Sequence, residues 1–74
     1  MSVKLRFKKL ANGSKSYYLD IYQDGARHYE FLKIYVHKGD TNKKEKKELA
    51  ESIRAKRELE IKNEEFGLNY WSLN

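Results

Sequence analysis

Apolar and polar residues alternate over the first part of the chain. Val3, Leu5 and Phe7 alternate with basic residues, which is the period-two pattern of a strand buried on one side. Residues 11–14 (Ala-Asn-Gly-Ser) have the composition of a turn, and residues 16–22 alternate again. These patterns predict an antiparallel hairpin with one apolar face and one basic face.

A third strand is predicted over residues 27–36, which are rich in aromatic and β-branched side chains. Its register depends on the turn before it. A two-residue loop at Asp24-Gly25 would place Glu30 opposite Leu19 and put a carboxylate among apolar side chains. A three-residue loop with a glycine bulge would place Tyr29 opposite Leu19 instead. Because this choice makes the buried face apolar, we expect the three-residue loop, with a bend or bulge late in the strand.

Residues 42–66 are strongly helix-forming, with Asp40 or Thr41 as the expected N-cap and Gly67 as a C-terminal stop. One stripe of this helix is mostly apolar and narrow enough to cover one face of a three-stranded sheet. Its members are Leu49, Ala50, Ile53, Arg57 and Ile61. Leu59 and Phe66 lie off this stripe, where they would either pack on the sheet edge or meet another domain.

The predicted fold is therefore α+β: a three-stranded antiparallel sheet packed against one C-terminal helix, in the order β-β-β-α. We expect one domain over residues 1–67 and a linker over residues 68–74, which contains Tyr70 and Trp71. The expected core consists of Val3, Leu5, Phe7, Tyr17, Leu19, Ile21, Tyr29, Phe31, Leu49, Ile53 and Ile61.

Composition excludes several classes of protein. The chain has 74 residues, so it forms at most one small domain. It contains no Cys, which excludes disulfides and thiolate metal sites. The N-terminus lacks the apolar segment of a secretory signal and no stretch is long enough to span a membrane, so we expect a cytoplasmic protein without a membrane partner.

No residues form a recognisable catalytic or metal-binding pattern. The two histidines, His28 and His37, lie in a predicted strand and a predicted loop without a carboxylate at metal-site spacing. No serine adjoins both a His and an Asp in the sequence, and no glycine run could cradle a phosphate. We therefore expect no enzymatic activity, no cofactor, no metal and no small-molecule substrate.

Charge is distributed unevenly along the chain. Residues 1–39 contain eight Lys or Arg and three acids, whereas residues 40–74 contain eight of each, so the first half carries the whole net charge of +5. A basic, tyrosine-bearing sheet followed by a charge-balanced helix is typical of a module that binds a polyanion.

The first strand is the most informative basic segment. Lys4, Arg6 and Lys8 project from one face about 6 to 7 Å apart, close to the spacing of phosphates along a DNA strand. Exposed strand lysines also discourage edge-to-edge aggregation, which is the alternative explanation. The residues expected on this face are Lys4, Arg6, Lys8, Ser16, Tyr18, Asp20, Tyr22, His28 and Glu30.

Lysines at the start of the helix give a second indication. Lys43, Lys44, Lys46 and Lys47 oppose the helix dipole, which local stability does not favour but a polyanion docked there would. The alternative is an ordinary solvated helix, because lysines are followed four residues later by glutamates.

The order of these elements resembles a known family. Val3-Lys-Leu-Arg-Phe, the Asn12–Leu32 segment with its Asp-Gly turn and Arg-His-Tyr-Glu run, a lysine-rich loop and the Ala50–Ile61 helix segment together carry the resemblance. They are similar to the N-terminal arm-type DNA-binding domain of tyrosine recombinases, the integrases of phages and conjugative transposons, especially those of the Bacteroides type. The similarity covers roughly residues 3–67.

The resemblance implies a sheet inserted in the major groove at arm-type sites of double-stranded DNA. It implies a bacterial, nucleoid-associated protein of a mobile element, whose core-binding and catalytic domains would be separate partners. The DNA-binding residues it implies are Lys4, Arg6, Lys8, Tyr18, Tyr22, Arg27 and His28. Two alternatives stay open: a protein-interaction adaptor, and a degenerate double-stranded RNA-binding module. Against the second, the sequence predicts no helix before Val3, where the RNA-binding fold has one.

Overall fold

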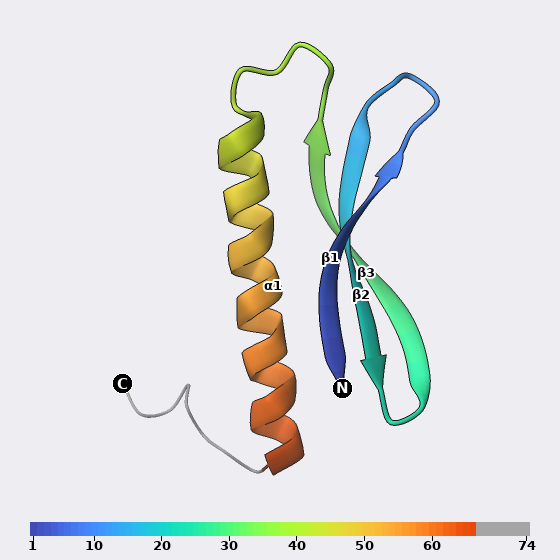
Figure 1. The fold of residues 1–74 in the computed structure, drawn as a ribbon, viewed down its shortest axis with the longest axis vertical. Helices are drawn as coiled ribbons and strands as arrows, with labels where there is room; N and C mark the ends of the chain where they lie inside the picture. The colour runs from blue at the N-terminus through green and yellow to red at the C-terminus, as the bar shows by residue number, and fades with distance from the viewer. Residues whose placement is uncertain (67–74) are drawn as a thin grey trace.

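The computed structural model describes the backbone of residues 1–66 and the side chains of residues 1–64. Three antiparallel strands lie in the order β1-β2-β3 and a helix follows them (Figure 1). This confirms the predicted β-β-β-α fold. The elements are β1 (Ser2–Lys9), β2 (Lys15–Gln23), β3 (Ala26–Val36) and α1 (Lys43–Phe66).

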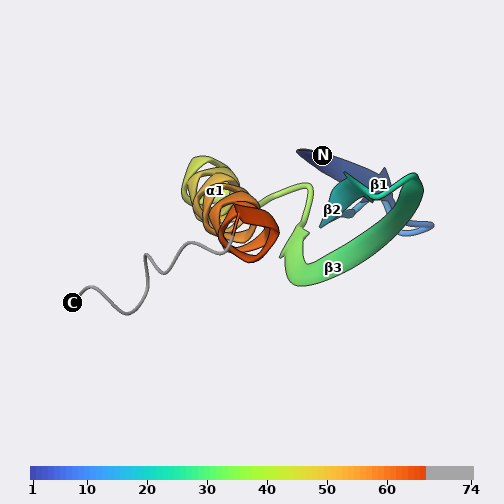
Figure 2. The same cartoon turned by 90° about the horizontal axis from the view of Figure 1, so that it is seen from below.

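Helix α1 covers one face of the sheet and leaves the other open. The helix contacts β1 and β3, while side chains of the central strand β2 fill the space between them. Figure 2 shows α1 on one side of the sheet, with β3 curving along its edge. We call the side that carries α1 the covered face and the opposite side the open face.

The first hairpin forms as predicted. The Leu10 carbonyl accepts hydrogen bonds from the Gly13 amide at 3.0 Å, and the Leu10 amide donates to the Ser14 carbonyl at 2.8 Å. Gly13 has a φ of 85°, which explains why the turn needs glycine there. Val3 pairs with Ile21 and Leu5 with Leu19, so the apolar side chains of both strands share the covered face.

The register predicted for the second hairpin was wrong. Asp24 and Gly25 form a two-residue loop with φ values of 54° and 76°, as in a type I′ turn, and Leu19 pairs with Glu30 rather than with Tyr29. The positive φ values at both loop positions match the right-handed twist of the flanking strands, which favours the short loop.

The carboxylate that argued against this register has a partner on the helix. Glu30 accepts two hydrogen bonds from Arg57, from Nε to Oε1 and from Nη2 to Oε2, each at 2.9 Å. Arg57 was the one charged residue in the otherwise apolar stripe of the helix. The bidentate pair removes the penalty of an unpaired charge, and the carboxylate in turn raises the pKa of the Arg57 guanidinium above its usual value.

The predicted irregularity late in β3 is confirmed. Ser16 pairs with Tyr35 and Tyr18 with Phe31, so three residues of β3 lie opposite one residue of β2. Lys33, in the middle of these three, has a φ of 59° and adopts the left-handed conformation. Beyond this bulge Val36 is buried again.

The core is smaller than predicted. Buried apolar side chains from all three strands and the helix form it, and Leu5, Leu32 and Ile53 pack against them. The buried apolar residues are Val3, Leu19, Ile21, Val36, Ala50 and Ile61. Four residues assigned to the core are instead about half exposed: Phe7, Tyr29, Phe31 and Leu49.

Two causes explain these corrections. The changed register moves Tyr29 and Phe31 to the open face. For Phe7 and Leu49 the cause is the twist of the sheet, which carries the far end of the first hairpin away from the straight helix (Figure 1). A hollow of about 470 Å³ beside Phe7 is lined by Phe7, partly exposed Tyr17 and Lys47 among others.

The start of α1 also differs from the prediction. The carbonyl of Asn42 accepts the first hydrogen bond of the helix, from the Lys46 amide at 3.0 Å, which places the cap at Asn42 rather than at Asp40 or Thr41. The helix continues to Phe66 as expected. The predicted stop at Gly67 and the predicted linker over residues 68–74 lie outside the described residues, as does the side chain of Phe66.

Candidate nucleic-acid interface

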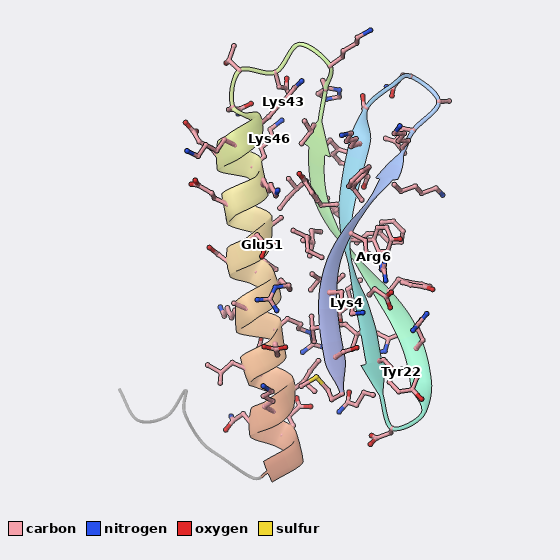
Figure 3. The ribbon with its side chains drawn as sticks, in the orientation of Figure 1. Lys4, Arg6, Tyr22, Lys43, Lys46 and Glu51 are labelled. Carbon is pink, nitrogen blue, oxygen red and sulfur yellow. The ribbon has the colours of Figure 1, made fainter. Side chains whose placement is uncertain are left out.

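The open face gathers basic and aromatic side chains into rows that cross the three strands. One row runs from Arg6 through Tyr18 to Phe31, and the next joins Lys4, Asp20 and Tyr29. Figure 3 shows Arg6 on the side of the sheet away from α1. The strand pairing places six of the seven predicted DNA-binding residues on this face: Lys4, Arg6, Lys8, Tyr18, Tyr22 and Arg27.

His28 lies on the other face, so the facing predicted for it was wrong. It pairs with Ile21, whose side chain is in the core, and its imidazole lies 3.8 Å from the carboxylate of Glu30. The two-residue loop is the cause, because a shift of register by one residue turns every side chain of the strand over. The same shift brings Arg27, Tyr29 and Phe31 to the open face in place of His28 and Glu30.

An ion-paired cluster occupies the centre of the open face. Arg6 donates a hydrogen bond from Nε to Oδ2 of Asp20 at 2.7 Å, and Arg27 Nε lies 3.4 Å from Oδ1 of the same carboxylate. The Asp20 side chain is only 7% exposed, whereas those of Arg6 and Arg27 are 49% and 56% exposed. One buried acid therefore holds two arginines that remain open to solvent.

Aromatic rings form the neighbouring part of the open face. The Tyr18 ring meets Tyr29 edge to face, with centroids 5.6 Å apart, and Phe31 in a tilted contact at 5.2 Å. Together with Lys8 they line a hollow of about 160 Å³. Tyr29 and Phe31 were not predicted as surface residues, although the Asp-Gly dipeptide, a strong signal for a two-residue loop, indicates this register.

The tip of the second hairpin extends this surface. The Arg27 guanidinium lies over the Tyr22 ring, 5.8 Å from its centroid, and the two residues pair across β2 and β3. This contact is within the range of a cation–π interaction and keeps the arginine on the open face.

The lysines at the start of α1 have separate roles. Lys46 donates hydrogen bonds from Nζ to Asp40 Oδ2 at 2.8 Å and to the Tyr35 carbonyl at 2.6 Å, so it anchors the loop before the helix. This lysine and the His37 backbone amide hold the pKa of Asp40 below its usual value. Lys43, in contrast, lines a hollow of about 140 Å³ together with Lys15 and Lys38.

Ser14 and His37 meet although they are far apart in the sequence. Ser14 Oγ lies 2.8 Å from His37 Nδ1, while Asp40 accepts a hydrogen bond from the His37 backbone amide rather than from its ring. Ser14 is 3% exposed. The contact joins the two loops at this end of the domain. The Ser14 hydroxyl is buried and the Asp40 carboxylate binds the His37 backbone rather than its ring, so the three residues do not have the arrangement of a catalytic triad.

Residues 1–66 contain no group of three or more His, Cys, Asp or Glu side chains that could hold a metal ion. Within these residues, α1 is not apolar enough to cross a membrane.

Comparison with known proteins identifies the family of the chain. A family model described as Arm DNA-binding domain matches residues 3–69. No curated protein and no solved structure matches the chain significantly. Because the match covers almost the whole chain, the protein belongs to the Arm DNA-binding domain family, the arm-type DNA-binding domains of tyrosine recombinases, and its partner is double-stranded DNA.

Proposed function

We propose that the open face of the sheet enters the DNA major groove and thereby serves as the arm-site module of a site-specific recombinase. The observation that carries this proposal is the arrangement of Arg6, Arg27, Lys4 and Lys8 around exposed aromatic rings on the face that α1 leaves uncovered. Most of the covered face, in contrast, is occupied by the helix and the core.

The dimensions of the sheet suit this binding mode. Three strands about 4.8 Å apart span about 10 Å between the outer backbones. The major groove of B-form DNA is about 12 Å wide and exposes a distinct set of donors and acceptors for each base pair. Helix α1, on the opposite side, would then point away from the DNA.

Each kind of side chain has a suitable partner in that groove. Lys4 and Lys8 are exposed on β1, at the edge of the sheet, where phosphates of the groove wall would lie. Arg6 and Arg27 present guanidinium groups that fit the O6 and N7 acceptors of guanine. The ring of Phe31, 56% exposed, offers an apolar surface to a thymine methyl group.

The recombinase context extends the proposal to partners and activity. Other domains of the same recombinase would carry out the core-site binding and the strand cleavage, and this domain alone would catalyse nothing. The integrases of bacterial mobile elements, which the sequence resembles, act on DNA in the cytoplasm, and we propose the same location here.

Fluorescence anisotropy with short labelled duplexes of DNA and of RNA, repeated over a salt series, tests this function. Neutralisation of about four to six phosphates predicts a log–log slope of affinity against salt near −4 to −5. We expect this steep slope with DNA and weaker binding to RNA. A preference for RNA would favour the RNA-binding alternative. An affinity that does not change with salt concentration would favour the protein adaptor.

A further inference from the structure

Asp20 is an acidic residue at the centre of a surface that must approach phosphates. A negative charge there weakens DNA binding by simple repulsion. A neutral residue at the same position in β2, between Lys4 on one neighbouring strand and Tyr29 on the other, would avoid that repulsion. The carboxylate therefore calls for an explanation beyond charge.

The contacts made by Asp20 supply that explanation. Its two oxygens hold two different arginines, Arg6 from β1 at Oδ2 and Arg27 from β3 at Oδ1. Both contacts use Nε of the arginine. These contacts leave the edge formed by Nη1 and Nη2, which can make bidentate hydrogen bonds to guanine, on the other side of the guanidinium group.

We propose that Asp20 is a positioning residue for base recognition, which fixes the guanidinium groups of Arg6 and Arg27 so that each meets a guanine in the major groove. This inference rests on the proposed function. A free arginine side chain loses rotamer entropy when it is fixed, and a side chain held in advance loses less on binding. Because both arginines converge on one carboxylate, the two guanines fall within the same few base pairs.

The proposal predicts opposite effects on two affinities. Removal of the Asp20 charge should strengthen binding to unrelated DNA, because one repulsive charge is gone. The same change should weaken selective binding, because the arginines are no longer held. A residue that only stabilised the sheet would leave the ratio of the two affinities unchanged.

Three variants separate geometry from charge. Asp20→Asn removes the charge and keeps the size of the side chain. Asp20→Glu keeps the charge but lengthens the side chain by one methylene group, so it displaces both guanidinium groups. Asp24→Asn is the control: it removes one charge at the hairpin loop, at a φ of 54° that asparagine adopts readily.

The experiment measures Kd for a duplex selected from a random pool by the wild-type domain and for an unselected duplex of equal length. We expect the Kd for the unselected duplex divided by the Kd for the selected duplex to fall about tenfold or more in Asp20→Asn and in Asp20→Glu, which corresponds to about 1.4 kcal/mol of selectivity. In Asp24→Asn both affinities should rise together and the ratio should stay constant. An unchanged ratio in both folded Asp20 variants would overturn the proposal, and if one variant unfolds, the other decides.

Modified bases provide a second readout. Replacement of single guanines in the selected duplex by 7-deazaguanine removes the N7 acceptor from the major groove. We expect this replacement to weaken wild-type binding at two nearby guanines and to matter much less in Asp20→Glu. If the wild-type domain selects no sequence, or if its affinity does not depend on salt, the proposed function itself fails. If the domain selects guanines and 7-deazaguanine weakens binding equally in wild type and in Asp20→Glu, only the role of Asp20 fails.

Discussion

The two faces of the sheet use the same three strands and differ in how each one pairs a carboxylate with arginine. On the covered face, Glu30 receives both of its hydrogen bonds from a single arginine of the helix, at 2.9 Å each. On the open face, Asp20 divides its oxygens between Arg6 and Arg27, which come from two strands. The first arrangement links the sheet to the helix, whereas the second leaves two arginines about half exposed to solvent.

The difference shows how alternate side chains of one strand serve two purposes. Leu19 and Ile21 of β2 are fully buried beneath the helix, while Tyr18 and Tyr22, which flank them in the strand, face outward. Stability therefore depends on the covered face, and the proposed function assigns DNA recognition to the open face. Variants on the two faces should separate these properties.

The largest expected effect is on the covered face. Leu19→Ala should lower the free energy of unfolding by about 2 to 5 kcal/mol, because Leu19 is 0% exposed and its loss leaves a cavity. In a domain of this size that is a large part of the total stability. Urea unfolding followed by circular dichroism measures the change.

Phe31→Ala is the matched variant on the open face. It should cost less than about 1 kcal/mol of stability, because the ring is 56% exposed. A loss of about 3 to 5 kcal/mol, typical of a core phenylalanine, would contradict the register with the two-residue loop.

Arg6→Ala should weaken DNA binding without unfolding the domain. The expected loss is about 1 to 3 kcal/mol of binding free energy, roughly 5- to 150-fold in Kd, for an arginine that contacts a base. Asp20 keeps its pair with Arg27, so the sheet should stay intact. Anisotropy gives the Kd and circular dichroism the fold; unchanged affinity would remove Arg6 from the interface.

Glu30→Gln tests the ion pair of the covered face. We expect a loss of about 1 kcal/mol of stability, because the pair with Arg57 is bidentate but about one-third exposed. Glu58→Gln is the control, since Glu58 lies 3.8 Å from Arg54 on the helix and should contribute less than about 0.5 kcal/mol. Equal effects of the two changes in urea unfolding would show that the Glu30 pair is not special.

The smallest effect concerns pH and lies at the end of the sheet, outside both faces. Lys46 lowers the pKa of Asp40 below its ordinary value of 3.8, so the contact stabilises the fold above that pH and is lost as pH falls through the lowered value. Wild type should melt slightly above Asp40→Asn at pH 7, and the gap should begin to narrow as pH falls below about 4. A gap that does not narrow at all as pH falls below about 4 would contradict the role of the charge.

The sequence was sufficient for the elements of the fold because each depends on local patterns. Alternation predicted the first two strands, and the stripe through Ile53 and Ile61 predicted the buried side of α1. The register of β3 was not local in this sense. It depended on whether a carboxylate could be accommodated opposite Leu19, and the answer came from Arg57, 27 residues further along the chain.

The candidate site was predicted in the same uneven way. Six of seven residues lie on the open face because they follow from the alternation of β1 and β2 or from the hairpin tip. The facing of His28 depended on the incorrect register. Two contacts join different elements through side-chain geometry: the one between Asp20 and Arg6, and the one between Ser14 and His37. No spacing in the sequence encodes either of them.

The most direct test of the account compares one charge reversal on each side of the domain. Lys8→Glu changes the open face next to Tyr18 and Phe31, and Lys62→Glu makes the same change of net charge at an exposed position of α1. At one salt concentration, we expect Lys8→Glu to raise the Kd for duplex DNA by about tenfold or more, and Lys62→Glu by less than about threefold, because distant charges are screened. Equal losses, or a larger loss in Lys62→Glu, would contradict binding by the open face.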